Sequence, residues 1–256
     1  MTASAYFAEA IERYRATRAA NLACSSEDFG RHELVIVERP ATQPARFLLM
    51  ALTFGTGTVV SVHPDYLDWV RANVPTDKHY RAMFPNVLLQ PLAEEAARRG
   101  QLSGWRSPNL SFLPGAPPVA REVPGGLERR VVDAFWRDRV WPTGEFHNSL
   151  GELDPPENEG FKFAVALMDG DTIAAVAGAW DDSPGFAEIG VDVARAYRGR
   201  GLGEVVVTQL AAEIASRGEV PTYYCAPTNV RSHRNALGCG FLPVASSCRV
   251  TFEPAG

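Results

Sequence analysis

The chain has 256 residues, 46% of them hydrophobic and 21% charged, and a formal net charge of −5 at pH 7. This composition is typical of a globular protein with one large or two modest domains. The acidic balance argues against a general nucleic-acid-binding protein, and no apolar run approaches the ~20 residues of a membrane span.

The N-terminal part predicts a small α/β arrangement. Apolar residues recur at helical spacing over residues 4–18. Three β-rich runs follow, at 32–40, 46–54 and 58–62. Two more helices are expected, one starting at Pro64 and one over 87–100. We interpret residues 1–115 as an accessory α/β domain, with a degenerate second copy of the C-terminal domain as the alternative.

A stretch rich in proline and glycine follows this part. The sequence FLPGAPPVAREVPGG, residues 112–126, contains four prolines and three glycines. Such a composition disfavours both a helix and a central strand. We therefore place a linker at 116–126 and a second domain at 127–256.

The second domain is expected to begin with a helix over 127–140, followed by a hairpin over 161–180 with Asp169–Gly170 at its turn. A strand, FAEIGVDV, covers residues 186–193. The remaining expected elements are, in order, a helix from about Glu204 to Arg217, a strand at 221–227, a short helix ending near Gly238 and a strand at 241–252. This order predicts a mixed α/β domain with an antiparallel start.

The loop after the strand 186–193 holds three glycines and three arginines within residues 195–203. Glycines let backbone N–H groups approach an anion, and the N-terminus of the next helix presents its positive end to that anion. A P-loop is excluded because Glu204, and not lysine, follows the last glycine. The glycine spacing also differs from the dinucleotide-binding fingerprint. An Arg-x-x-Gly-x-Gly pattern over 198–203 remains, and a plain glycine turn with solvated arginines is the alternative.

Three motifs of the C-terminal half stand in a fixed order. The loop YRGRGLG comes first, Asn229 follows the next strand, and a Gly-Phe pair ends twelve residues later at Phe241. In this order and spacing, residues 125–252 resemble the GNAT superfamily of acyl-CoA-dependent N-acyltransferases. The resemblance implies a mostly antiparallel mixed sheet flanked by helices, with acetyl-CoA as cosubstrate and no metal.

The resemblance also implies which residues hold the cosubstrate. In this family the loop's backbone N–H groups bind the pyrophosphate of coenzyme A. Here the corresponding residues are Arg198, Gly199, Arg200, Gly201, Leu202 and Gly203. The preceding strand is expected to splay from its neighbour and to expose backbone at Val191 and Val193 to the pantetheine arm. Asn229 would contact that arm or the acyl group, unless it is a helix cap, and Ser232 is a further candidate for the same region.

Glu188 and Asp192 are the candidates for a general base. An amine is mostly protonated at pH 7, so its proton must be removed before the nitrogen attacks a thioester. The two acids lie four residues apart, on one face of the strand unless a bulge separates them. Glu188 lies in FAEI, where one branch of the resembled family carries its base. For Asp192 the alternative is a carboxylate bonded to backbone at the edge of the loop.

One position departs from the family pattern. Many members carry a tyrosine seven residues after the asparagine, as acid for the departing thiolate, and this chain has Ala236 there. The general acid is therefore unassigned, and Tyr197, Tyr223 and Tyr224 are expected to be packing residues. We expect an N-acetyltransferase acting on a primary amine by direct attack, and the departure keeps open a non-catalytic acyl-CoA-binding module or sensor.

The remaining expectations concern metal, thiols and partners. His63 and His79 have no partners at metal-ligand spacing, so no metal site is expected. The four cysteines lack CxxC spacing, and Cys225 and Cys248 are expected to be buried thiols. With no signal peptide visible, we expect a cytoplasmic protein. Its partner is expected to be a small-molecule or peptide amine, with no nucleic acid and no membrane, and the sequence leaves a homodimer open.

Overall fold

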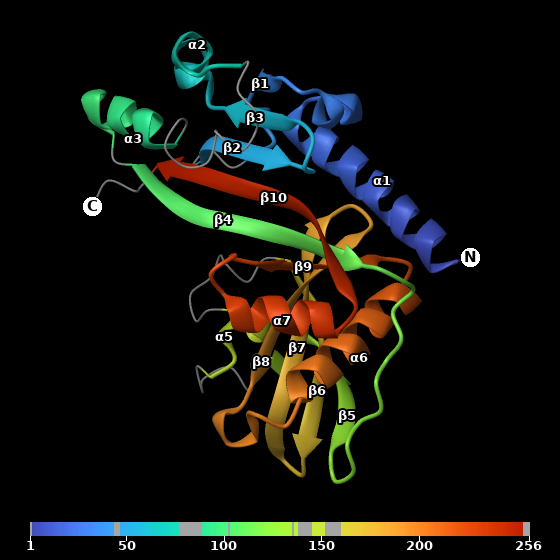
Figure 1. Ribbon diagram of the computed structural model, residues 1–256. Coiled ribbons are helices and arrows are strands. Elements are labelled where there is room, and N and C mark those ends of the chain that lie inside the picture. Colours follow the sequence, from blue (N-terminus) through green and yellow to red (C-terminus); the bar gives the residue numbers. More distant parts are fainter. Residues whose placement is uncertain are drawn as a thin grey trace. The chain divides into compact units, whose positions relative to one another are not determined.

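The computed structural model describes residues 2–43, 47–76, 89–101, 103–134, 136–137, 145–151 and 160–252 (Figure 1). The chain forms two compact units. The N-terminal unit consists of Ile11–Ser111, Ala226–Thr228 and Val244–Gly256, and the C-terminal unit of Met1–Ala10, Phe112–Cys225 and Asn229–Pro243. The domain boundaries expected from the sequence stay a prediction.

The N-terminal unit combines helices with a sheet. Its elements are, in chain order, α1 (Ala3–Leu22), η1 (Ser26–Gly30), β1 (Leu34–Glu38), β2 (Phe47–Thr53), β3 (Thr58–Val62), α2 (Pro64–Asn73), α3 (Leu89–Arg98), β4 (Ser103–Pro114) and β10 (Phe241–Phe252). Of these, α1 and β10 begin in the other unit, and β4 ends in it. β3 pairs parallel with β1 and antiparallel with β2, which pairs antiparallel with β10. The expected helices and strands of this part are confirmed.

β4 is an element that the sequence did not predict. Its segment, SGWRSPNLSFLP, contains glycine, proline, asparagine and serines, which are depleted in strands. Its strand conformation follows from pairing with the neighbouring β10, where the Thr251 hydroxyl also donates to the Gly104 carbonyl at 3.2 Å. Tertiary pairing here overrides local propensity.

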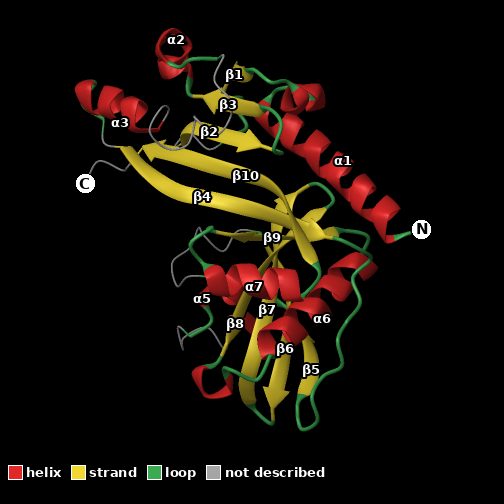
Figure 2. Ribbon diagram, in the orientation of Figure 1, coloured by secondary structure: helices red, strands yellow, loops and turns green. Residues whose placement is uncertain are grey.

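The C-terminal unit is a mixed sheet with helices on both faces. Its elements are β5 (Glu128–Val132), α5 (His147–Leu150), β6 (Phe161–Asp169), β7 (Thr172–Ser183), β8 (Phe186–Val193), η4 (Arg195–Tyr197), α6 (Leu202–Ser216), β9 (Val220–Cys225) and α7 (Val230–Gly238). Strands β5 to β8 are antiparallel neighbours in chain order, and β9 joins β8 in parallel. The mixed, mostly antiparallel fold class expected from the sequence is confirmed (Figure 2).

The helix expected over 127–140 is wrong at its start. Residues 128–132 are the strand β5, with Val131 opposite Val165 of β6. The two adjacent valines are β-branched and favour a strand, and the free edge of β6 offers ladder hydrogen bonds that the helical spacing alone did not reveal. Residues 135 and 138–140 lie outside the described part of the chain.

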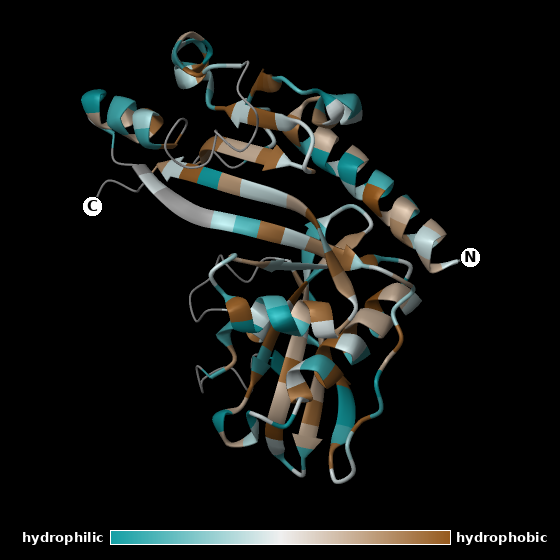
Figure 3. Ribbon diagram, in the orientation of Figure 1, coloured by the Kyte–Doolittle hydropathy of each residue, from teal (hydrophilic) through white to brown (hydrophobic). Residues whose placement is uncertain are grey.

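The core of this unit lies on both faces of β6 and β7, whose central residues are buried and mostly hydrophobic (Figure 3). α6 packs against β6, β7 and β8, and Figure 1 shows it in front of these strands. Its Val206, Leu210 and Ile214 are fully buried. Burial of each such side chain contributes about 1.5–3 kcal/mol, so α6 is firmly held against the sheet. No helix in the described residues is long and apolar enough to cross a membrane.

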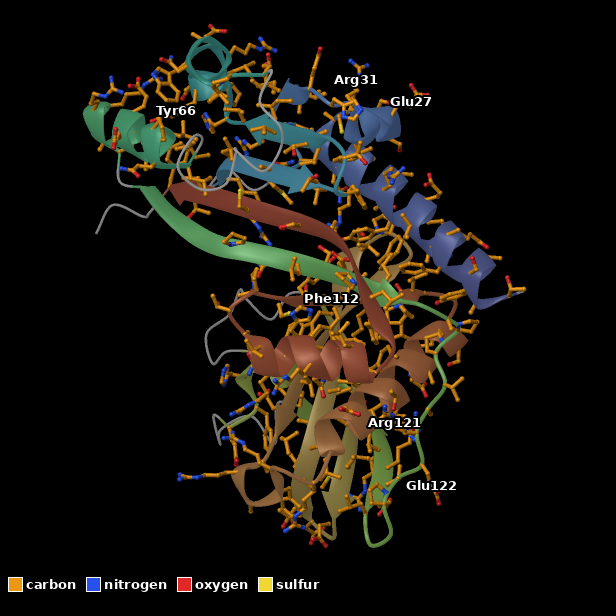
Figure 4. The ribbon with its side chains drawn as sticks, in the orientation of Figure 1. Glu27, Arg31, Tyr66, Phe112, Arg121 and Glu122 are labelled. Carbon is orange, nitrogen blue, oxygen red and sulfur yellow. The ribbon has the colours of Figure 1, made fainter. Side chains whose placement is uncertain are left out.

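The segment between β4 and β5 has neither helix nor strand (Figure 2). Arg121 fixes it to the unit: its guanidinium binds Glu204 and the Gly238 carbonyl, and its backbone N–H donates to Thr208 Oγ1 at 3.2 Å. Figure 4 labels Arg121 and its neighbour Glu122 on this segment. After Arg121, residues 122–126 are mostly exposed.

This arrangement predicts where a glutamate-specific protease cuts among the described elements. Cleavage after the exposed Glu122 should precede cleavage after Glu204 or Glu213, because α6 is packed and hydrogen-bonded. Mass spectrometry of a time course measures the order. Arg121→Ala should accelerate the first cut, since it releases the segment from α6. A first cut inside α6 would contradict the linker assignment.

Candidate functional site

β8 and β9 separate part of the way along their length. Their parallel register runs from Phe186 opposite Val220 to Ile189 opposite Tyr223, although β8 continues to Val193. On its other edge, β8 stays paired with β7 up to Val193. The sheet therefore opens between β8 and β9 beyond Ile189, and within the described part of the chain the last four residues of β8 have a strand partner on one edge only.

The glycine-rich loop follows at the open end of β8. Gly199 has φ +79° and Gly201 has φ +75°, a left-handed conformation that favours glycine, and an added Cβ at either position would meet nothing within 4 Å. Position 203 requires glycine for a different reason, because a Cβ there would lie 2.9 Å from Asn235 Oδ1 of α7. Two glycines thus shape the loop, and the third allows α7 to approach α6.

The loop presents backbone donors at the start of α6. Among the described residues, none accepts a hydrogen bond from the N–H groups of residues 199–203, whereas those of Glu204 and Val205 donate to the Gly201 carbonyl. The first N–H groups of a helix lack partners inside it, and the helix dipole makes this end positive. The arrangement can therefore bind an anion such as a phosphate group.

The loop arginines are exposed, and two of them bond to the backbone nearby. Arg198 Nε donates to the Val193 carbonyl at 3.1 Å and ties the loop to the end of β8. Arg200 donates to the Ala196 carbonyl at 3.4 Å and lies 5.1 Å from the centroid of the Tyr197 ring. These cations add positive charge around the N–H groups.

Asn229 and Ser232 begin α7. Asn229 Oδ1 accepts from the Ser232 N–H at 3.1 Å, so Asn229 is the helix cap, and the Ser232 hydroxyl lies 2.9 Å from the hydroxyl of Tyr223. A role of either residue in binding a cosubstrate stays a prediction.

Glu188 lies in the middle of a row of side chains across three strands. It is opposite Trp180 of β7 and Thr222 of β9, and paired residues of neighbouring strands point to the same face of a sheet. Its side chain is half-buried. The pairing with β7 has no register shift between residues 188 and 192, so Asp192 lies on the same face and the bulge considered from the sequence is absent from this stretch.

Asp192 holds α5 against that face. Its carboxylate accepts from Asn148 Nδ2 at 2.7 Å, from the Ser149 N–H at 2.8 Å and from Ser149 Oγ at 2.9 Å. The bond from the Ser149 N–H corresponds to the structural alternative for Asp192, a carboxylate bonded to backbone, and the other two donors are side chains.

Two glycines that sequence reasoning missed let α5 reach the strands. A Cβ at Gly178 would lie 1.8 Å from the Ser149 carbonyl oxygen, and one at Gly190 would lie 1.8 Å from that of Asn148. Glycine inside a buried strand often marks such a close backbone approach, and this was the available signal. α5 therefore forms a wall beside Glu188.

The tyrosines near the loop are all hydrogen-bonded. Tyr197 donates to Asp169 Oδ2 at 2.8 Å and Tyr224 to Asp182 Oδ2 at 2.7 Å, and Tyr223 is bonded to Ser232 as described above. Ala236, at the position of the family tyrosine, is fully buried. Two cavities in the described part of this unit, of about 630 and 280 Å³, include neither Glu188 nor the loop. We therefore define the site by the strands and the loop.

His63, Cys225 and Cys248 lie in the described part of the chain. No group of three or more His, Cys, Asp or Glu side chains among the described residues could hold a metal ion. His63 caps α2 by accepting from the Asp65 N–H, and His79 lies outside the described residues. Cys225 and Cys248 are buried free thiols, as expected. Burial raises the pKa of Cys248 to about 12, so it stays protonated at neutral pH.

The role of Asp192 can be tested through stability. Asp192→Ala should lower the free energy of unfolding by about 1–3 kcal/mol in a urea titration, because it removes the acceptor of three hydrogen bonds. Asp192→Asn keeps an acceptor oxygen and should lose less. Asp171→Ala, in the exposed hairpin turn, is the matched control and should change little. Equal stability of Asp192→Ala and wild type would show that α5 is held by other contacts.

Comparison with known proteins places the site in a family. Residues 129–241 match the model of the "Acetyltransferase (GNAT) family", a range that contains β8, the loop, α6 and α7. No curated protein gives a significant match.

Solved structures similar to the chain carry related names. A putative acetyltransferase of the GNAT family from Novosphingobium aromaticivorans DSM 12444 is 21% identical, with 64% of this chain and 82% of that chain covered and a TM-score of 0.45. A GCN5-related N-acetyltransferase from Kribbella flavida is 18% identical, with 95% of both chains covered and a TM-score of 0.48. A GCN5-related N-acetyltransferase-like protein from Streptococcus suis 89/1591 is 13% identical, with 96% and 100% covered and a TM-score of 0.46. The family match is decisive: residues 129–241 form a domain of the GNAT acetyltransferase family.

Proposed function

We propose that the protein is an N-acetyltransferase that moves an acetyl group from acetyl-CoA to a primary amine of a small molecule or peptide. One observation carries the proposal: five backbone N–H groups without a partner in the described chain lie at the start of α6, directly after the strand that bears Glu188.

The residues present fit coenzyme A. Residues 198–203 would hold its pyrophosphate through backbone N–H groups, and the open space at the Cβ positions of Gly199 and Gly201 leaves room for an anion. Val191 and Val193, on the open stretch of β8, would offer backbone groups to the pantetheine arm. Asn229 and Ser232 would line the same arm from α7.

The chemistry that follows is direct acyl transfer. Glu188 takes a proton from the acceptor ammonium, and the freed nitrogen attacks the thioester carbonyl carbon. A C–N bond forms and the C–S bond breaks, the new amide nitrogen loses its remaining extra proton to water, and the departing thiolate takes a proton from water.

A second candidate is a non-catalytic acyl-CoA-binding module or sensor. The observation that favours it is Ala236, which is buried and offers no acid where many family members carry tyrosine. The two candidates differ in whether any amine releases free thiol from acetyl-CoA, which a screen of primary amines measures.

The loop should bind coenzyme A. Gly201→Glu places a side chain at φ +75° and a carboxylate among the N–H groups, so it should abolish acetyl-CoA binding in calorimetry. Gly218→Glu is the matched control, because Gly218 has φ +82° and open space at the other end of α6. Its affinity should stay near wild type. Equal affinity of Gly201→Glu and wild type would remove the loop from the cosubstrate site.

Glu188 should act as the general base. Glu188→Gln keeps the shape and removes the proton acceptor, so turnover at neutral pH should fall by roughly 10²- to 10⁴-fold with acetyl-CoA affinity unchanged. The loss should shrink at high pH, where free amine is already present.

Two outcomes would contradict this assignment. Full turnover of Glu188→Gln together with loss in Asp192→Asn would move the role of base to Asp192. Full turnover in both variants would exclude a carboxylate from β8.

A further inference from the structure

Asp182 connects β7 to β9 across β8. Its Oδ2 accepts from Thr222 Oγ1 at 3.1 Å and from the Tyr224 hydroxyl at 2.7 Å. Both donors belong to β9, whereas Asp182 belongs to β7, and β8 lies between these strands. The side chain of Asp182 in β7 thus binds β9, the second strand along the sheet from β7.

The position of this connection in β7 is irregular. The register of β7 against β8 shifts between Asp181 and Ser183, which places Asp182 at a bulge. A bulge re-aims a side chain that regular pleating would hold in line, and such bulges are common beside active sites. Here the re-aimed carboxylate reaches Thr222 and Tyr224.

The connection lies where β8 and β9 part. Thr222 is opposite Glu188, and Tyr223 is the last residue of β9 that pairs with β8, so Tyr224 is the first residue beyond that pairing. Its hydroxyl bond to Asp182 therefore holds β9 at the start of the opening, next to the row that contains Glu188.

A purely stabilising role is the simplest alternative. A tyrosine–aspartate hydrogen bond can stabilise the fold wherever it occurs, and this domain has another one between Tyr197 and Asp169. The bonds of Asp182 differ because they join the bulge to the first residue of β9 beyond its pairing with β8 and to the residue opposite Glu188.

We propose that Asp182 and Tyr224 are positioning residues of the acetyl-transfer site. Their hydrogen bond fixes the width of the opening between β8 and β9, and through it the distance between Glu188 and a thioester bound in that opening. The proposal rests on the proposed function for the identity of the bound group. It assigns to Asp182 an acceptor role that an amide oxygen can also fill, so its charge is not the essential property.

Steady-state kinetics of the full chain tests the effect on catalysis, with acetyl-CoA and the best amine of the screen. Because a small misplacement of reacting groups can cost up to about 10²-fold, Tyr224→Phe and Asp182→Ala should each lower kcat by roughly 10-fold or more. The KM for acetyl-CoA should change little, since the loop is intact. Asp182→Asn should keep most of kcat because its amide oxygen accepts both hydroxyls.

A double-mutant cycle separates the hydrogen bond from two independent effects. The double variant Asp182→Ala/Tyr224→Phe should be no slower than the worse single variant, since both remove the same bond. Tyr66→Phe is the matched control, because it removes another tyrosine hydroxyl that is hydrogen-bonded to a side chain, here that of Gln101 in the N-terminal unit. Its kcat should equal that of wild type.

Amide hydrogen exchange of the same variants tests the proposal without turnover. Peptides covering residues 220–228 should exchange faster in Tyr224→Phe than in wild type, and not in Tyr66→Phe. If no amine is acetylated by wild type, the proposed function fails, and exchange alone then decides the connection: faster exchange supports it and unchanged exchange overturns it.

Three results would overturn the proposal. Multiplicative losses in the double variant would mean that the two residues act separately. A normal kcat in Asp182→Ala with a low kcat in Tyr224→Phe would mean that Tyr224 touches the reactants itself. An Asp182→Asn variant as slow as Asp182→Ala would mean that the charge matters and not the hydrogen bond.

Discussion

The end of pairing between β8 and β9 is the constraint on which the candidate site depends. Backbone N–H and C=O groups inside a protein need partners, and strands normally supply them to each other. Beyond Ile189, β8 keeps its partner on the β7 edge and has no β9 partner. The loop extends this feature, because residues 199–203 add backbone donors without an acceptor among the described residues. A ligand with amide and phosphate groups complements both parts: its amides can pair with the open edge of β8, and its phosphates can accept from the N–H groups of the loop.

Each face of the sheet carries a different helix beside this opening. On one face α6 is packed by fully buried residues such as Leu210, so the N–H groups at its start sit on a rigid element. On the other face α5 lies directly on Gly178 and Gly190 and is held by Asp192. Glu188 is on this second face. The proposed base therefore belongs to β8, and the proposed cosubstrate loop follows the open end of the same strand.

Much of this arrangement could be predicted from the sequence, because it leaves local signals. Alternating and helical spacing located β8, α6 and α7, and the spacing of the loop glycines indicated an anion site. The reason why residue 203 is a glycine could not be predicted, since the atom that a side chain there would meet belongs to Asn235 on another helix. The strand β5 could not be predicted either. Its segment has four apolar residues at helical spacing, and only pairing with the edge of β6 makes it a strand. The hydrogen bonds of Asp182 depend on a bulge and on a strand forty residues away, and no local pattern records them.

The most direct test of the central claim is an NMR titration of the full chain with coenzyme A. The amide protons of Gly199, Gly201, Leu202 and Gly203 should shift downfield together as they donate to the pyrophosphate. Pantetheine, which lacks the phosphates, should leave these four resonances in place. Binding of coenzyme A that leaves the four loop amides unshifted would contradict the account.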